Sequence, residues 1–398
     1  MAEVARALPR GGARRQGDAS WEALEAIGPV DALLLGISHE ARILPAVMPV
    51  NAAAERARLV DRVRAGDTPT PRWELGRRRI DAAPWRAVAQ AREMARARLA
   101  RPLRELYLAR LDELEVDLAL IEAIGDPVRV RPLAARRFGT GMREVEWGDG
   151  PVRVAAVARG LLERLAPHEE ARVVSPEDLA ARVTEAARTA GLPDLTVRID
   201  PRLVAGAATG DRGVFLASRS FGQHEARRLV VHEVLGHAVT AANAARQPLR
   251  IFECGTAGSF ADQEGLAICL EEAAGLLDGH RLRVLAARVV ATDRLHSGAT
   301  FGETARALVR QHGFSAEAAV AIAERAHRGG GVARDAGYLY GYLRVRAALR
   351  ARRATVDALR VGRVGLDDLE LVQSLQAIGL ARPARLRPSL ARVTASPL

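Results

Sequence analysis

Apolar residues recur at helical spacing through most of this chain. Before residue 170, four segments place apolar side chains three and four positions apart, the spacing of one helix face: 21–37, 52–66, 85–123 and 153–165. A further helix is expected to start at Ser175, with Pro176 at its first position. Helical spacing then returns over residues 221–375 with few interruptions. These segments predict a mainly helical protein.

Two short runs differ from the helical pattern. Residues 195–199 and 213–217 are rich in β-branched and apolar residues, and a loop rich in glycine and aspartate separates them, which is typical of β-strands. They precede an apolar helix around residues 229–239, and residues 220–223 (Ser-Phe-Gly-Gln) predict a capping box at its start. The predicted fold class is therefore α+β, mostly α, with a short β-sheet that precedes the apolar helix.

We expect four stretches along the chain. Residues 1–20 are expected to form a disordered lead, because they lack the apolar segment of a signal peptide. Residues 21–170 would form an N-terminal helical region, 171–380 a domain that contains the strands and the apolar helix, and 381–398 a mobile tail. No stretch has the roughly 18 uncharged apolar residues of a transmembrane helix, so no membrane contact is expected.

The apolar helix carries residues that suit a metal site. His232 and Glu233 are followed by His237. Two imidazoles on one helix can bind Zn²⁺, and a neighbouring carboxylate can deprotonate a zinc-bound water. The alternative is a buried helix with two hydrogen-bonded histidines and a chance glutamate.

The spacing of the two histidines is unusual. The common motif HExxH separates them by four positions, whereas His232 and His237 are five apart. On a regular α-helix the second ring would point about 140° away from the first. A π-bulge would absorb the extra residue and realign the rings, and Gly236 makes such a distortion easier.

A third ligand is available at Glu264, which opens another apolar helix over residues 266–273. Two histidines and one glutamate are a known ligand set of catalytic zinc. Glu253, Glu271 and Glu272 compete weakly for this position, and they are also candidates to hydrogen-bond the far nitrogen of a liganding histidine.

HExxxH followed by Gln-Glu-Gly-Leu-Ala at residues 263–267 resembles the bacterial "flavohaemoglobin expression-modulating QEGLA-motif" proteins. That family also includes the microtubule-associated tyrosine carboxypeptidase of animals. Asn243, residues 247–249, and the segments 325–330 and 334–341 match further motifs of the family. The chain departs from the family pattern in three places: Ala244 replaces glycine, Arg334 replaces lysine, and Leu235-Gly236 replaces Gly-Thr.

The resemblance implies that residues 171–380 form a zincin-like catalytic domain, in whose core His232, His237 and Glu264 bind Zn²⁺ and Glu233 is the general base. Tyr338 aligns with the family motif, and we expect it to donate a hydrogen bond to the developing oxyanion, unless it only packs in its helix.

An enzyme that cleaves at a chain end must also neutralise the substrate's terminal carboxylate. Arginine suits that task, because its planar guanidinium binds carboxylate in bidentate fashion. Arg325, Arg328 and Arg334 surround the glycine run 329–331 and are the candidates. They could equally be solvated residues at helix ends. We expect Asp335 to orient an arginine or a ring nitrogen rather than to act on substrate.

The basic composition does not change this interpretation. The 398-residue chain has a formal charge of +11 and a pI near 10.9, which would ordinarily suggest nucleic acid or an anionic membrane as partner. However, the chain contains no lysine, its arginines are spread among acidic residues, and aromatic residues make up only 4%. No nucleic-acid partner is expected. Two cysteines imply no disulfide framework, so we expect a cytoplasmic protein.

The sequence therefore predicts a zinc metallopeptidase, with carboxypeptidase action on a peptide or protein C-terminus as the favoured activity. The alternatives are a zinc amidohydrolase that acts on a small metabolite and a non-catalytic metal-binding regulator. Glu233 favours catalysis, because a regulator needs the ligands but not the base. The substrate and the oligomeric state are left open.

Overall fold

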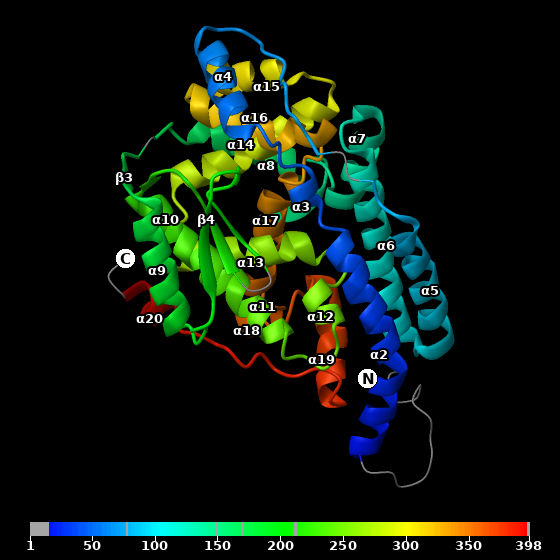
Figure 1. Cartoon of the computed structure of the whole chain (residues 1–398). Coiled ribbons are helices and arrows are strands. Elements are labelled where there is room, and N and C mark those ends of the chain that lie inside the picture. Colours follow the sequence, from blue (N-terminus) through cyan, green and yellow to red (C-terminus); the bar gives the residue numbers. More distant parts are fainter. Residues whose placement is uncertain (1–15, 77–78, 148–149, 169, 211–212, 396–398) are drawn as a thin grey trace.

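The structure is a computed structural model that describes residues 16–76, 79–147, 150–168, 170–210 and 213–395. Figure 1 shows a mostly helical molecule with a few short strands, which confirms the predicted α+β class with helices predominating. Most of the expected lead, residues 1–15, lies outside the described residues, and the first helix begins at Gln16. No helix among the described residues is long and apolar enough to cross a membrane.

The N-terminal region is mainly helical, with one strand pair between its last two helices. The predicted helix over 85–123 is in fact two, because the backbone is extended at Leu99 and Ala100 and Pro102 occupies the first turn of the second helix. Helices α2, α5 and α6 run side by side (Figure 1). The helices of this region are α2 (Gln16–Glu40), α3 (Ile43–Ala46), α4 (Ala52–Arg64), α5 (Ala82–Arg98), α6 (Arg101–Ala123), α7 (Pro127–Phe138) and α8 (Val154–Arg164).

The short strands of the described chain lie between residues 144 and 222. Strands β4 (Thr196–Asp200) and β6 (Gly213–Ala217), both predicted, pair in parallel. The loop between them holds a third strand that the pattern did not reveal, β5 (Ala207–Thr209), which pairs antiparallel with β6 at the edge of the sheet. Two smaller sheets pair β1 (Glu144–Trp147) with β2 (Gly150–Arg153), and β3 (Arg172–Val174) with β7 (Phe221–Gly222).

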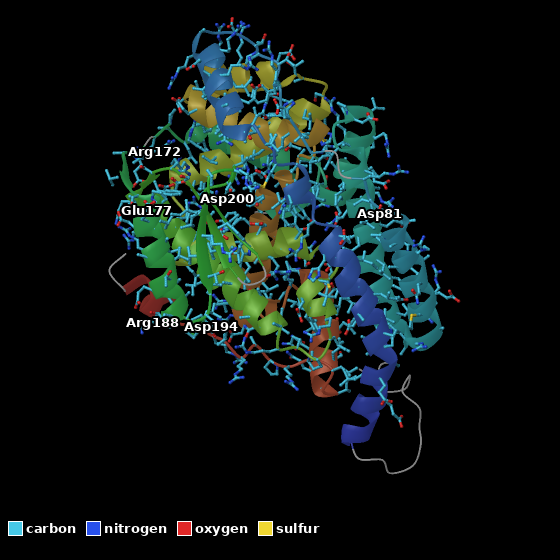
Figure 2. The ribbon with its side chains drawn as sticks, viewed as in Figure 1. Asp81, Arg172, Glu177, Arg188, Asp194 and Asp200 are labelled. Atoms are coloured by element: carbon cyan, nitrogen blue, oxygen red, sulfur yellow. The ribbon has the colours of Figure 1, made fainter. Side chains whose placement is uncertain are left out.

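Helix α9 (Pro176–Thr189) is capped by Ser175 as expected, and its exposed side carries charged residues such as Glu177 and Arg188 (Figure 2). The predicted capping box at 220–223 is wrong. Helix α10 (Gln223–Val230) has Gly222 as its N-cap, and the distant Glu170 carboxylate accepts hydrogen bonds from the backbone N–H groups of His224 and Glu225. A long-range partner supplies the cap, which local sequence could not reveal.

The chain then forms one uninterrupted helical rod, made of α10, the π-helix η1 (Val231–Ala238) and α11 (Val239–Ala244). Strand β6 packs on η1 through its buried face. The remaining elements complete the molecule: α12 (Ile251–Cys254), α13 (Ser259–Ala273), α14 (Gly279–His296), α15 (Phe301–His312), α16 (Ala316–His327), η2 (Arg328–Gly330), α17 (Ala336–Arg350), α18 (Val356–Leu359), η3 (Leu366–Asp368), α19 (Leu369–Ala377) and α20 (Leu390–Ala395).

One hydrophobic core joins the N-terminal helices to the later part of the chain. Leu34 and Leu111 belong to the same buried cluster as Val234 and Leu266. The segment after residue 380, expected to be a mobile tail, also packs on the rod, and the Val393 side chain of α20 is fully buried. Asn243 exchanges two hydrogen bonds with the backbone of Leu386, at 3.0 and 2.8 Å.

Candidate metal centre

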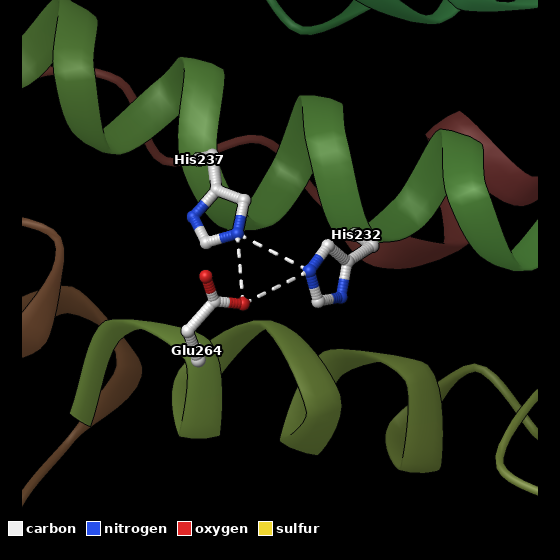
Figure 3. Close-up of side chains that lie close together, drawn as sticks. All are labelled: His232, His237 and Glu264. Atoms are coloured by element: carbon white, nitrogen blue, oxygen red, sulfur yellow. Dashed lines mark hydrogen bonds and ion pairs between the residues drawn. The ribbon is translucent and has the colours of Figure 1, made fainter. Parts of the chain in front are cut away.

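Three side chains from two helices converge on one point. The Nε2 atoms of His232 and His237 lie 3.2 Å apart, and they lie 3.4 and 3.5 Å from Oε2 of Glu264. Figure 3 shows both rings, from the η1 rod, facing the carboxylate on α13. Two imidazole nitrogens and one carboxylate oxygen are the donor types that zinc prefers.

The π-helix brings the two rings together. The segment 231–238 is π-helical, so the realignment that the five-residue spacing requires is present. Gly236 allows α13 to approach, because a Cβ there would lie 2.6 Å from Cβ of Ala267. The Leu235 carbonyl, in the same turn, accepts a hydrogen bond from the guanidinium of Arg360 at 2.9 Å, and the Gly236 carbonyl accepts one from the Thr240 hydroxyl at 2.7 Å.

Glu264 fits a metal ligand by its own environment. Within the described residues, its Oε2 is buried and accepts no hydrogen bond, which is costly for a carboxylate oxygen unless a cation faces it. Burial alone would raise the pKa of Glu264, but the nearby His237 and His232 outweigh it and hold the pKa well below its usual value. The carboxyl group is thus in the ionised form that a metal requires.

Glu271 fixes the ring of His232 from behind. Its Oε1 lies 2.6 Å from Nδ1 of His232, and its carboxylate also accepts two hydrogen bonds from Arg281 and one from Arg228. Burial of Glu271 is more than offset by the two arginines, so its pKa is lowered. Burial lowers the pKa of His232, but the nearby carboxylates of Glu264 and Glu271 raise it to about 9. A carboxylate partner on Nδ1 leaves Nε2 to face the ligand triangle, the usual arrangement behind a liganding histidine.

Glu233 is buried beside the ligands and has a fixed orientation. The Thr209 hydroxyl, at the end of edge strand β5, donates a hydrogen bond of 2.7 Å to its Oε2. Nothing in the sequence distinguished Thr209, since it lies in a loop-like stretch of small residues. Its role depends on β5, which only the fold reveals.

Tyr338, Arg325 and Arg334 lie near the start of α13, the helix that carries Glu264. Tyr338, on α17, contacts the ring of Phe260 with centroids 6.0 Å apart, and Phe260 precedes Glu264 by one turn of α13. Arg325 donates two hydrogen bonds to Asp335, so Asp335 orients an arginine as expected. Arg334 lies over the Phe260 ring at 4.3 Å, and Arg328 is buried at the end of α16.

Arg288 was missed by the sequence interpretation. Its Nε lies 3.5 Å from Oδ2 of Asp335, and its guanidinium lies 5.3 Å from the centroid of the Tyr338 ring. In a chain with 59 basic residues, all arginine, nothing marks one arginine of α14 as special.

Three polar residues of the matched motifs have a structural explanation. Gln263 donates to the carbonyl groups of Leu359 and Val364, and Gln247 donates to those of Val361 and Arg382. With Asn243, they hold the C-terminal segment, residues 359–386, against the rod and α13.

A comparison with protein-family models matches residues 64–396 to the family described as "microtubule-associated tyrosine carboxypeptidase". The matched range includes both the candidate metal centre and most of the N-terminal helices. A search of curated proteins found no match.

Proposed function

The chain belongs to the microtubule-associated tyrosine carboxypeptidase family, and on that premise we propose that it is a zinc-dependent carboxypeptidase that removes the last residue of a peptide or protein. The convergence of His232, His237 and Glu264 on one point, through a π-helical turn, is the observation that carries the proposal. His232 and His237 would hold the ion through Nε2, and Glu264 through Oε2. When bound, zinc would polarise the scissile carbonyl and lower the pKa of the attacking water.

Glu233 is the general base of this proposal. It takes the proton of the attacking water and later passes it to the leaving amine. The hydrogen bond from Thr209 occupies Oε2 and so fixes the orientation of the carboxylate. The other oxygen, Oε1, is then the one that receives the proton.

Tyr338 is the donor that we assign to the developing oxyanion. Within the described part of the chain its hydroxyl makes no hydrogen bond that would occupy it. Burial, together with the charge of Glu264, raises the pKa of Tyr338 to about 12. The hydroxyl is therefore protonated at neutral pH and can donate.

The arginines near Asp335 and the start of α13 would bind the free carboxylate at the end of the substrate. Arg325 is already bonded to Asp335, so Arg288, Arg328 and Arg334 are the groups left to do so. An enzyme with such a subsite cleaves one residue from a free C-terminus and does not accept a blocked one.

Two measurements test the proposal together. We expect about one zinc ion per chain by elemental analysis, and cleavage of peptides with a free C-terminus that falls sharply when that terminus is amidated. Glu233→Gln should keep the zinc and lower kcat by about 10²–10⁴-fold, because the amide cannot accept the proton of water. The exposed change Glu177→Gln on α9 is the matched control.

The contrary outcomes separate the alternatives. Equal cleavage of free and amidated peptides would exclude carboxypeptidase action and favour an amidohydrolase. A chain that binds zinc, retains it in Glu233→Gln and turns over no peptide would favour a metal-binding regulator.

A further inference from the structure

Four arginines gather around one carboxylate beside the metal centre. Arg288 comes from α14, Arg325 and Arg328 from the end of α16, and Arg334 from the loop before α17; together they form what we call the arginine cluster. Asp335 accepts two hydrogen bonds from Arg325 and lies 3.5 Å from Nε of Arg288. It is the single carboxylate within ion-pair distance of any member, as far as the described residues show.

Three members of the cluster lack hydrogen-bond acceptors. No described residue accepts a hydrogen bond from the side chain of Arg288, Arg328 or Arg334. Arg328 is only 6% exposed and the Arg288 side chain only 14%. The nearby acid Glu324 is already bonded to Arg56, at 2.8 and 3.2 Å. Each guanidinium carries five N–H donors, and buried donors without acceptors are costly.

The cluster lies next to the ligands. Arg334 stacks on Phe260 at 4.3 Å, and Phe260 and Glu264 occupy the same face of α13, one turn apart. Arg288 and Arg325 lie 5.3 and 5.9 Å from the centroid of the Tyr338 ring, which in turn contacts Phe260. A substrate residue on the leaving side of the scissile bond would therefore meet these side chains.

The charge of the cluster exceeds what one carboxylate can balance. Arg288 and Arg325 share Asp335, whereas Arg328 and Arg334 lie within ion-pair distance of no described carboxylate, so positive charges remain in the cluster. The terminal carboxylate of a substrate neutralises one of them and can bond to one or two forks. Glu233 and Glu264 are committed to the metal centre. A second negative charge on the same substrate residue would occupy the remaining donors.

We propose that the residue removed carries a second acid, so that the preferred substrates end in glutamate or aspartate. This inference rests on the proposed carboxypeptidase function and adds the identity of its terminal residue. It differs from the tyrosine named by the matched family, and the difference follows from the arginine cluster.

The electrostatics of the cluster agree with an anionic ligand. Burial, followed by repulsion from Arg325, lowers the pKa of Arg288 to about 9 and that of Arg328 to about 10. Both remain charged at neutral pH. A bound dicarboxylate residue would relieve the repulsion and supply the missing acceptors.

The test compares peptides that share one body and end in Glu, Gln or Tyr, each with a free C-terminus. We expect kcat/KM for the Glu peptide to exceed that for the Gln peptide by at least about tenfold, because Gln matches Glu in shape but lacks the charge. Arg288→Met and Arg334→Met should each bring this ratio toward one without loss of zinc. Arg188→Met, on the exposed face of α9 (Figure 2), should leave it unchanged.

Binding gives a readout that does not depend on turnover. The zinc-loaded Glu233→Gln variant should bind the Glu peptide more tightly than the Gln peptide in calorimetry. If the Gln or Tyr peptide is bound and cleaved as well as the Glu peptide, the acid preference is wrong and the carboxypeptidase function stands. If no peptide is cleaved, the proposed function is wrong, and equal binding of the Glu and Gln peptides would overturn the acid preference separately.

Discussion

His327 closes helix α16 with its imidazole buried, at 3.0 Å from the Thr304 hydroxyl and edge-on to the Phe301 ring. Burial, with added repulsion from Arg131 and Arg294, lowers its pKa from 6.5 to about 4. In the unfolded chain the same group would take up a proton near pH 6.5. The contribution of His327 to the free energy of unfolding is therefore fully present above that pH. It falls by about 3 kcal/mol as the pH falls toward 4.

The prediction is checked by urea unfolding of metal-free protein at pH 7.5 and pH 4.5. His327→Gln should reduce the pH dependence of the unfolding free energy, because glutamine does not titrate in this range. His39→Gln, an exposed histidine near the end of α2, should leave the dependence as in the parent chain. An unchanged slope for His327→Gln would show that the imidazole is not kept neutral by burial.

At the same scale, sequence could predict a side chain only where spacing constrained it. The positions of His232 and His237 predicted a π-bulge, and the structure has one. Glu271 was one of three candidates behind a ligand, and the fold selects it. Arg288 carried no signal, because its neighbours at the cluster come from α16 and the loop after it, tens of residues away in the chain.

At the scale of elements, α13 and α17 touch backbone to backbone. A Cβ on Gly265 would lie 2.2 Å from the carbonyl oxygen of Gly341, and a Cβ on Gly341 would lie 1.8 Å from that of Ala261. The pair of glycines thus sets the depth at which α13 presents Glu264 to the rod.

Gly265→Ala should force the two helices apart. Overpacking of this kind typically costs about 1–3 kcal/mol, and here it should also weaken zinc binding, since Glu264 is the adjacent residue. Gly28→Ala is the matched control: Gly28 lies on α2 with nothing within 4 Å of its added Cβ, so alanine should stabilise by about 0.5–1 kcal/mol. Zinc titration and chemical denaturation of both variants decide the point, and normal zinc affinity in Gly265→Ala would contradict it.

Element boundaries followed the local pattern unless a distant residue or a short break intervened. Strands β4 and β6 and helix α4 lie close to where alternation and spacing predicted them. The break between α5 and α6 was not seen, because Leu99 and Ala100 continue the apolar pattern while their backbone is extended. The cap from Glu170 was invisible for a different reason, since it depends on a tertiary contact.

At the scale of the whole molecule, the N-terminal helices contact the elements that flank the candidate metal centre. The buried carboxylate of Asp31 on α2 accepts hydrogen bonds from the Tyr107 hydroxyl at 2.7 Å and from the backbone N–H of Arg250 at 2.8 Å. Glu113 on α6 accepts one from the backbone N–H of Gly258, just before α13. The sequence suggested a division near residue 170, but apolar periodicity cannot reveal which helices share one core.

Because these contacts cross the expected division, residues 171–398 expressed alone should not form a stable metal centre. Removal of 1–170 would expose the apolar faces of α12, α14, α16 and α17 that pack on it, and would leave the N–H groups of Arg250 and Gly258 without their acceptors. Each such loss costs about 1–3 kcal/mol, and most domains are stable by only about 5–15 kcal/mol. Circular dichroism and zinc uptake of the fragment test this, with the full chain as reference. In the full chain, Asp31→Ala should lower the unfolding free energy measurably, because Tyr107 and Arg250 lose one acceptor together. A fragment that unfolds cooperatively and binds zinc like the full chain would show that the N-terminal helices are a separate domain.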